Sequence, residues 1–380
     1  MIPALSSAQW IHVADALALA GILAACVAAA AHFAAARALD ATARKARFAA
    51  HATTLILWLT AGAMTLSMIQ RGLEVNHFPS QTMSEVLSMF STALLLSMIA
   101  LHYALGLRRR GPAWSMLDDA LIVLVLAGSF FTHRYTATLS TAQRDLPPAL
   151  QSYWFPPHLS ALIFSYATLA IAGLICLVYF SMRFWSGVFV GGQTFKRQLW
   201  VVLTFAFVPF AQVVTLPVLA LVGLVFLVLR SRDRVPSAAT LAVLERDLDD
   251  VSYRAFTVGM PFLTAGLFMG AFWAQEAWAN YWGWDSKENS ALISWLVYVV
   301  YVHLRMLGGY RGERAMAVLI GGSLAIFTTF QLFGFLPDSQ KSMHRYTDDN
   351  VVPREGMQAP PDAQKTSMAD GAANAANQGK

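Results

Sequence analysis

The chain has 380 residues, of which 57% are hydrophobic and only 13% charged; its formal net charge is +5 and its mean hydropathy is +0.50. Apolar runs of 18 or more residues recur, which is typical of membrane-spanning helices, whereas the alternating ten-residue strands of a membrane barrel are absent from the sequence. In lipid a helix satisfies its own backbone hydrogen bonds, so the composition predicts an all-α, polytopic integral membrane protein. The modest net charge gives no reason to expect a nucleic-acid partner.

The cysteines and the first residues exclude several classes of protein. Cys26 and Cys176 both lie in apolar runs and form no CxxC pair, which argues against a thiol reductant. No CxxCH motif occurs, so the chain does not carry a covalently attached c-type haem of its own. The first ten residues contain no Lys or Arg. We therefore expect the first apolar run to be a retained span rather than a cleaved signal peptide.

About eight transmembrane helices are expected along the chain. They cover about residues 10–36, 49–69, 83–107, 116–131, 158–182, 255–272, 291–306 and 315–336. Basic residues follow the first, third and fifth of these spans, and the positive-inside rule then places both the N- and the C-terminus outside. On this topology the inner loops carry 18 of the 27 Lys and Arg residues.

The region of about residues 183–254 is predicted to be an insertion on the cytoplasmic side. Basic residues flank its apolar stretch 199–229 at both ends, and Pro209 and Pro217 divide that stretch into parts shorter than the ~20 residues of a crossing. We expect a re-entrant or interfacial helical pair, with a single kinked crossing as the alternative. Residues 241–254 are expected to form a short amphipathic helix. One transmembrane domain, 1–346, would then precede a disordered external tail, 347–380.

A tryptophan-rich external segment, 273–295, follows the sixth span. Its five tryptophans are Trp273, Trp278, Trp282, Trp284 and Trp295, and its charged residues include Asp285, Lys287 and Glu288. Trp278 and Trp282 are four residues apart, so on a helix they would share one face. The segment offers either a flat platform for a planar ligand or an aromatic belt at the membrane surface.

Three histidines are candidates for metal ligation. The predicted topology brings His158 and His344 to the same external side as the tryptophans, where two imidazoles could be the axial ligands of a flat metal macrocycle. His303 lies about twelve residues into the seventh span, and an ionisable residue at such depth favours a functional role. Packing or loop roles remain the alternative for each.

The tryptophan-rich segment also carries a family resemblance. The stretch WANYWGWDSKENSALISWLVYVVYVHLR resembles the WWD signature of the haem-handling proteins of cytochrome c maturation, and among them the CcsA (ResC) family, the membrane subunit of the system II cytochrome c synthase. Two further segments, PPALQSYWFPPHLSALIFSYA and FGFLPDSQKSMHRY, resemble the parts of that family with the external haem-ligand histidines. HFPSQTMSEVL resembles a third motif more weakly, and Ser286 and Asn289–Ser290 depart from the WWD pattern.

The resemblance implies a function in cytochrome c biogenesis, namely delivery of haem b and its presentation outside for thioether attachment to apocytochrome c. The chain would be the membrane subunit of a cytochrome c synthase, or haem lyase. Its haem and metal ligands would be His158, His344 and His303. The catalytic platform would comprise Trp278, Trp282, Trp284 and Asp285, with Trp295, Lys287 and His77 as further haem-binding residues.

The resemblance also implies partners and a location. A CcsB (ResB) membrane protein would complete the haem path, apocytochrome c with its CxxCH motif would receive the haem, and thiol-reducing proteins would act indirectly. The expected location is the bacterial cytoplasmic membrane, with the haem site on its periplasmic side. Two other functions stay open: a haem-b or quinone electron-transfer subunit, and a lipid-linked transferase that uses Asp285 and Glu288.

Overall fold

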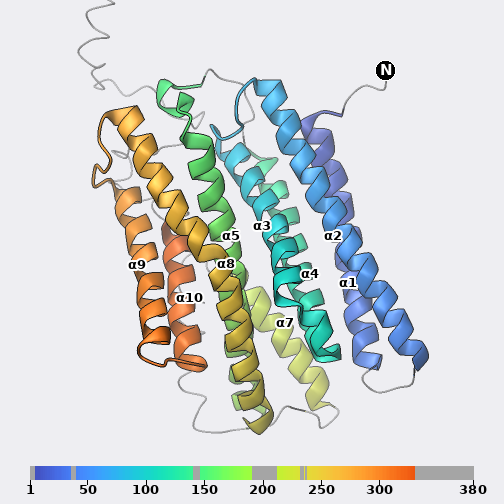
Figure 1. Ribbon diagram of the computed structural model, residues 1–380. Helices are drawn as coiled ribbons and strands as arrows, with labels where there is room; N and C mark the ends of the chain where they lie inside the picture. Colours follow the sequence, from blue (N-terminus) through green and yellow to red (C-terminus); the bar gives the residue numbers. More distant parts are fainter. Residues whose placement is uncertain are drawn as a thin grey trace, which may run out of the picture. The chain divides into compact units, whose positions relative to one another are not determined.

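Every regular element in the described part of the chain is a helix. The computed structural model describes residues 5–35, 40–139, 146–190, 212–231, 235 and 238–329. Its α-helices are α1 (Ser7–Ala35), α2 (Asp40–Val75), α3 (Met83–Leu105), α4 (Pro112–Thr136), α5 (Phe155–Val190), α7 (Gln212–Arg230), α8 (Ala238–Trp278), α9 (Ser286–Met306) and α10 (Glu313–Phe327); the 3₁₀ helices are η1 (Leu107–Arg110) and η2 (Pro148–Gln151). The axes of the α-helices are roughly aligned, and the chain runs up and down along them (Figure 1). The predicted all-α, polytopic membrane fold is confirmed.

Six helices have the length and hydropathy of a membrane span. Their apolar stretches are Ser7–Ala28, Phe48–Val75, Met83–Arg110, Trp114–Thr136, Phe155–Val190 and Leu241–Trp278. The two remaining predicted spans correspond to α9 and α10. α9 has a polar first turn, SKENS, and at ~1.5 Å per residue its 21 residues reach about 31 Å, close to the thickness of the hydrocarbon layer. Within the described residues, each of the eight predicted spans therefore lies on a helix, and the last part of the eighth, 330–336, lies outside them.

Several helices are longer than the predicted spans. α8 has 41 residues, roughly 60 Å, and includes the sequence 241–254 that was predicted to form a separate amphipathic helix. That prediction is wrong, because no helix-breaking residue separates 241–254 from the apolar part of α8. Pro261 lies inside the continuous helix, as membrane helices tolerate. Residues 183–190 likewise continue α5.

α7 corrects a second expectation about the cytoplasmic insertion. The helix runs without interruption from Gln212 to Arg230, through Pro217, so Pro217 does not divide the apolar stretch. It packs against α5, where the Trp185 indole N–H donates to the Leu219 carbonyl at 2.9 Å. Pro209 and the rest of 191–211 lie outside the described residues.

α5 and α8 form a close antiparallel pair through small residues of α8. A Cβ atom at Gly259 would lie 2.8 Å from the Leu169 side chain, and one at Gly266 would lie 2.6 Å from the Leu162 side chain. Glycine at such positions lets two membrane helices approach closely. The later glycine of α8, Gly266, meets the earlier leucine of α5, Leu162, so the two helices are antiparallel. The start of α5 therefore lies beside the end of α8 (Figure 1).

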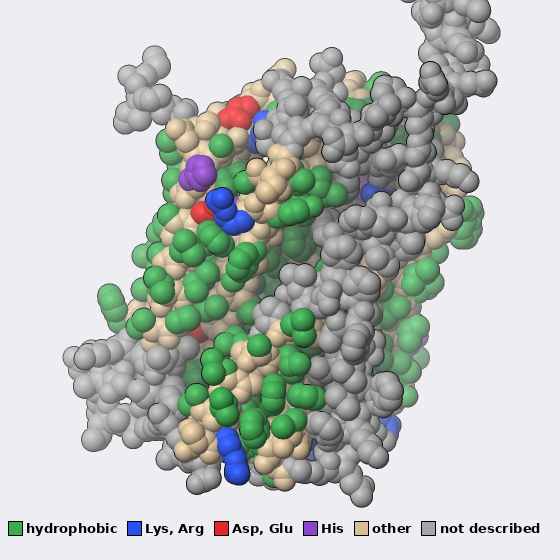
Figure 2. All heavy atoms as spheres, turned by 180° about the vertical axis from the view of Figure 1, so that it is seen from behind, with side chains coloured by type: hydrophobic (Ala, Val, Ile, Leu, Met, Phe, Trp, Pro, Cys, Tyr) green, Lys and Arg blue, Asp and Glu red, His purple; other side chains and the backbone are tan. Residues whose placement is uncertain are grey.

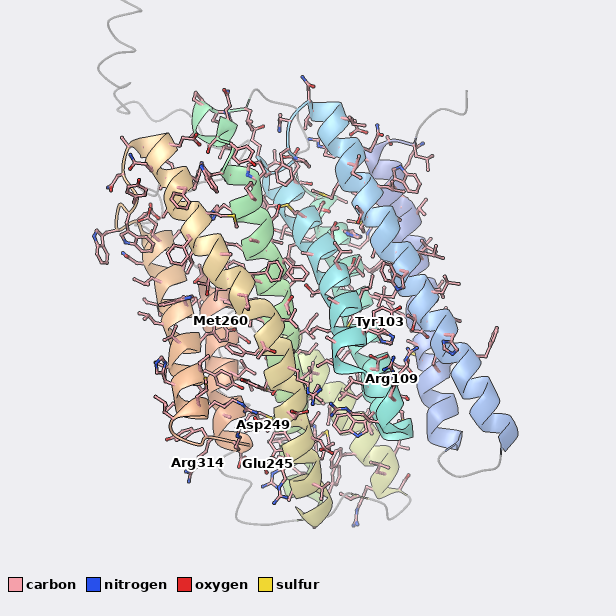
Figure 3. The ribbon with its side chains drawn as sticks, viewed as in Figure 1. Tyr103, Arg109, Glu245, Asp249, Met260 and Arg314 are labelled. Atoms are coloured by element: carbon pink, nitrogen blue, oxygen red, sulfur yellow. The ribbon has the colours of Figure 1, made fainter. Side chains whose placement is uncertain are left out.

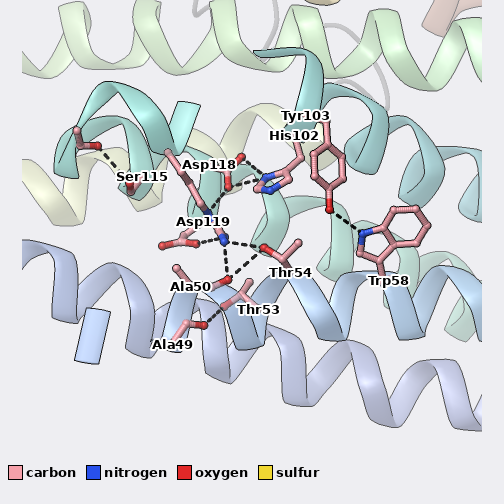
Figure 4. Close-up of polar contacts among 12 residues, drawn as sticks. Ala49, Ala50, Thr53, Thr54, Trp58, His102, Tyr103, Ser115, Asp118 and Asp119 are labelled. Carbon is pink, nitrogen blue, oxygen red and sulfur yellow. Dashed lines mark hydrogen bonds and ion pairs between the residues drawn. The ribbon is translucent and has the colours of Figure 1, made fainter. Parts of the chain in front are cut away.

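An ionic cluster ties α2, α4 and the end of α3 together (Figure 4). The Arg108 guanidinium lies 2.7 Å from the Asp118 carboxylate and 2.8 Å from that of Asp119, and it also donates to the Ala50 carbonyl. His102 contacts Asp118 at 2.9 Å. Both aspartates are fully buried. Removing one partner of such a buried pair costs ~3–5 kcal/mol, so the cluster fixes the packing of these helices.

A second polar cluster joins α8 to α9 and α10. Arg305 bonds Asp249 at 2.6 Å, and its guanidinium lies 4.1 Å from the centre of the Tyr253 ring. One turn earlier on α8, Glu245 accepts the backbone N–H of Glu313 and so caps the start of α10. Figure 3 labels Glu245 and Asp249 on this half of α8, away from the end that carries Trp278.

The surface of the bundle is largely apolar. Leu55, Leu59 and Leu66 of α2 and Phe262 and Phe268 of α8 are all exposed. Hydrophobic side chains cover much of the described part of the face seen in Figure 2. A surface of this kind is stable against lipid, which supports the assignment of an integral membrane protein.

Candidate functional site

A pocket lies where α5 begins, α8 ends and α9 begins. These ends adjoin at one side of the bundle (Figure 1), and residues from η2, the loop before α3 and the α8–α9 loop, with Thr329 after α10, complete the lining. The cavity itself has a volume of about 170 Å³, below the ~300–1,000 Å³ of small-molecule sites, so a large ligand would extend into its open mouth. The lining includes His158, Trp282 and Lys287, three of the residues selected from the sequence.

His158 lies in the first turn of α5, and its ring is fixed from α8. Its Nδ1–H donates to the backbone carbonyl of Gly266 at 2.8 Å. This hydrogen bond places the imidazole lone pair on Nε2. A backbone carbonyl that accepts the other ring N–H is the usual way a protein orients a metal-ligating histidine. The chemistry of His158 therefore fits a ligand of a metal held in the pocket.

Trp273 forms the wall beside this histidine. The two rings are stacked, with centroids 5.6 Å apart and an interplanar angle of 21°. Trp273 is only 3% exposed, and its indole N–H donates to the carbonyl of Ala149 in η2 at 2.8 Å. Trp278 packs edge-on against Trp273, with centroids 4.7 Å apart. Trp278 thus supports the wall from behind and does not line the pocket.

The tryptophan-rich segment is not one helix, so the predicted shared face of Trp278 and Trp282 is wrong. α8 ends at Trp278, and Ala279 follows with a φ of 55°. A left-handed residue at this position ends a helix. The Trp282 backbone N–H then donates to the Asn280 side chain, which stabilises a turn. Trp282, in this loop, lines the pocket, whereas Trp284 is 71% exposed and is not among the lining residues.

Asp285 and Glu288 form the N-terminal cap of α9. The Asp285 carboxylate accepts the backbone N–H of Lys287 at 2.8 Å. The Glu288 carboxylate accepts the backbone N–H groups of Asp285 and Gly283. This reciprocal arrangement is a capping box. Both carboxylates therefore hold the loop in the conformation that carries Trp282.

Two polar groups of this loop and cap face the pocket. Burial lowers the pKa of Lys287 to about 8 from its ordinary 10.5, and the nearby Asp285 carboxylate offsets part of that effect. The indole N–H of Trp282 is buried and has no hydrogen-bond partner within the described part of the chain. An N–H donor and an ammonium group beside an apolar pocket would suit a ligand that carries carboxylates.

Three other predicted site residues, Trp295, His77 and His303, do not line this pocket. Trp295 packs against α8 and donates to the Thr264 hydroxyl at 3.1 Å. His77 lines a separate apolar groove between α2, α3 and α5. His303 lies in the last turn of α9, exposed on the surface of the chain, and its Nδ1–H donates to the Val299 carbonyl at 2.8 Å. His344 lies outside the described residues.

The predicted site residues left out the part of the site that α8 supplies, although Trp273 was noted in the tryptophan-rich segment. Gly266, Gly270 and Trp273 are spaced four and three residues apart, so they share the face of α8 that meets the start of α5. Tyr281 also lines the pocket and was not selected. The helical spacing was visible in the sequence. Its meaning was not, because it depends on the register of α8 against α5.

Together, the fold and the pocket define a polytopic helical membrane protein with an oriented histidine in an aromatic pocket at one end of its bundle. The chain belongs to the cytochrome c assembly protein family, whose model, described as "Cytochrome C assembly protein", matches residues 49–336. This membership indicates a role in cytochrome c biogenesis.

The chain is also similar to individual members of the CcsA group. The cytochrome c biogenesis protein CcsA of Guillardia theta is 30% identical over 296 residues, which cover 78% of this chain and 84% of that protein. The CcsA of Heterosigma akashiwo (strain NIES-293 / 8280G21-1) is 32% identical over 71% of this chain and 77% of its own length. That of Prochlorococcus marinus (strain MIT 9303) is 31% identical over 73% and 79%. The predicted resemblance to the CcsA family is confirmed.

Proposed function

We propose that this protein accepts haem b as a transported substrate and presents it at the outer face of a bacterial cytoplasmic membrane for thioether attachment to apocytochrome c. The observation that carries the proposal is the state of His158. Its Nδ1–H is donated to Gly266, so Nε2 is the ligating atom, and the ring lines the pocket. Neutral imidazole with its second nitrogen hydrogen-bonded is a good haem-iron ligand.

The surroundings of His158 also fit a porphyrin. Trp273 and Trp282 supply aromatic lining, and leucine and isoleucine side chains supply apolar contact. Haem carries two carboxylates, for which the Lys287 ammonium and the Trp282 indole N–H are suitable donors. We assign His344, in the segment after α10, as the second axial ligand, and Trp284 to contact with the bound haem or apocytochrome.

The attachment reaction needs positioning more than acid–base groups. A cysteine S–H of the apocytochrome adds across a haem vinyl group: the sulfur–carbon bond forms, and the thiol proton passes to the neighbouring carbon. No electrons are gained or lost overall. Holding the macrocycle and the CxxCH segment in fixed geometry would supply most of the acceleration. The axial histidine, aromatic wall and cap of α9 are suited to that task.

The geometry of α9 argues against the transferase alternative. A lipid-linked transferase would use Asp285 and Glu288 as a catalytic pair. Both carboxylates instead accept backbone N–H groups in the capping box. Glu288 also lines the pocket, but both carboxylates are engaged by backbone N–H groups, so we favour haem presentation.

Replacement of His158 by Gly tests the proposal. The variant should lose bound haem and cytochrome c maturation, and about millimolar imidazole, the range of weak small-ligand binding, should partly restore both. His133→Gly is the matched control. Its ring is held by Asp15 and Ser91, at 2.7 and 2.8 Å, in a buried structural contact that a free ligand should not rebuild. Normal maturation by His158→Gly without imidazole would overturn the proposed function.

A further inference from the structure

Gly270 of α8 lies directly against the ring of His158. A Cβ atom at position 270 would be 2.5 Å from the Cε1 atom of His158 and 2.8 Å from its Nδ1 atom. Real Cβ contacts essentially never fall below 3.0 Å. Any side chain at position 270 would therefore displace the imidazole or the two helices.

The two neighbouring residues on the same face of α8 restrain the ring in other directions. The Gly266 carbonyl accepts the Nδ1–H bond, and Trp273 stacks on the ring. Three residues of α8 thus determine the position of the His158 ring. Gly266 accepts its hydrogen bond, Gly270 leaves room for it, and Trp273 stacks on it.

We infer that Gly270 is a positioning residue: its lack of a side chain sets where His158 presents Nε2 in the pocket. This inference rests on the proposed function, because it concerns the same ligand. An alanine methyl group would push the ring by roughly 1 Å, and misplacement of that size can cost on the order of 100-fold in rate. It would also pull Nδ1 away from the Gly266 carbonyl, which now accepts at 2.8 Å.

The other glycines of this helix pair meet different groups, which allows a matched control. A Cβ atom at Gly259 would lie 2.8 Å from the Leu169 side chain. Gly259 lies eleven residues from Gly270, or about 16 Å along the helix. Gly259→Ala would thus disturb the α5–α8 packing to a similar degree without contact to His158.

The first experiment compares Gly270→Ala with Gly259→Ala in the complete membrane-embedded protein. Both should accumulate at similar levels and have similar thermal stability. Gly270→Ala should lower cytochrome c yield at least about ten-fold and change the absorption spectrum of bound haem. Gly259→Ala should leave the spectrum unchanged. A Gly270→Ala protein with normal yield and spectrum would overturn the inference, as would equal losses in the two variants.

The second experiment separates positioning from packing. Imidazole should restore maturation to His158→Gly, but not to the double variant His158→Gly/Gly270→Ala, because the added methyl group occupies the space that the imidazole needs. Equal restoration of both proteins would overturn the positioning role and leave the proposed function intact. If His158→Gly needs no rescue, the proposed function itself fails.

Discussion

Two histidines near the same end of the bundle show how surroundings decide the role of an imidazole. His133 bonds Asp15 through Nδ1 and Ser91 through Nε2, so both nitrogens serve the packing of α1, α3 and α4. His158 gives its Nδ1–H to a carbonyl and lines a pocket with the rest of its ring. The sequence favoured His158 through the predicted topology, which placed it on the same side as the tryptophans, and through the family resemblance. The structural role of His133 was not visible in the sequence, because its partner Asp15 lies 118 residues away along the chain.

Lys287 should make haem retention depend on pH. Burial lowers its pKa to about 8, so below that pH the folded protein holds an ammonium group that can pair with a haem carboxylate. As pH rises above about 8 the free site loses that charge, and haem affinity should fall. The change can be measured by titrating the purified protein with haem b at several pH values between about 7 and about 9.5, from about 1 unit below this pKa to about 1.5 units above it.

The folding stability of the protein should change with pH in the opposite direction to its haem affinity. Since the folded pKa lies below 10.5, the neutral lysine is favoured in the fold, and stability rises as pH increases from about 8 toward 10.5. Lys287→Arg keeps its charge throughout this range and should flatten the haem-binding profile. If that variant keeps the same loss of affinity above pH 8, Lys287 does not pair with the haem.

At the scale of elements, the tryptophan-rich segment was only partly predictable. The sequence located it between two spans and selected Trp282 and Lys287, which both line the pocket. It did not reveal that Ala279 adopts a left-handed conformation. Alanine rarely does so, because its Cβ atom approaches the backbone, and tertiary contacts here override that preference. Because α8 ends at Trp278, Trp278 packs against Trp273 and Trp282 lies in the following loop.

Replacements of Asp285 should separate capping from catalysis. Asn can cap a helix as well as Asp, whereas loss of the cap to Ala costs ~1 kcal/mol. Asp285→Asn should therefore retain most cytochrome c yield, and Asp285→Ala should lose more, with a less stable α9. The measurements are cytochrome c yield and thermal unfolding. Equal loss of yield in both variants, with normal stability of Asp285→Asn, would show that the carboxylate charge itself serves the reaction.

The pairing of α5 with α8 leads to a prediction about residues 191–237, part of the segment that we expect on the cytoplasmic side. These helices are antiparallel neighbours, so residues 191–237 begin and end on one side of the bundle (Figure 1). A single kinked crossing within that segment is incompatible with this pairing. Reporter fusions at Trp185 and Ala238 should both report the cytoplasm. Opposite locations for the two fusions would contradict the register of the helix pair.

At the scale of the whole molecule, hydropathy was sufficient to find the helices but not their contacts. The described part of each predicted span lies on a helix, because a run of about 20 apolar residues satisfies its backbone in lipid only in that form. Packing against partners was harder to foresee. The Arg108 cluster with Asp118 and Asp119 joins segments that hydropathy treats separately. The clusters, like the pocket, depend on which faces of the helices meet.

His303 leads to a prediction about the assembled complex. It lies in the last turn of α9, at the far end of that helix from the pocket, and it is exposed on the surface of this chain. Its Nδ1–H donates to the Val299 carbonyl, so its Nε2 carries the lone pair, as in His158. An exposed histidine on a membrane helix is best explained by a site that a second chain completes. We propose that this second chain is the CcsB (ResB) partner that the family resemblance implies.

Haem that depends on His303 should therefore appear only in the complex with this partner. His303→Ala should lower the haem content of the purified complex and leave that of the isolated chain unchanged, because we expect the second ligand to come from the partner. Met306→Ala is the control: this residue is 71% exposed in the same turn of α9 and has no imidazole to lose. The absorption spectrum and haem content of each variant, purified with and without the partner, make the comparison. A loss of haem from the isolated chain on His303→Ala would mean that this chain completes the site by itself.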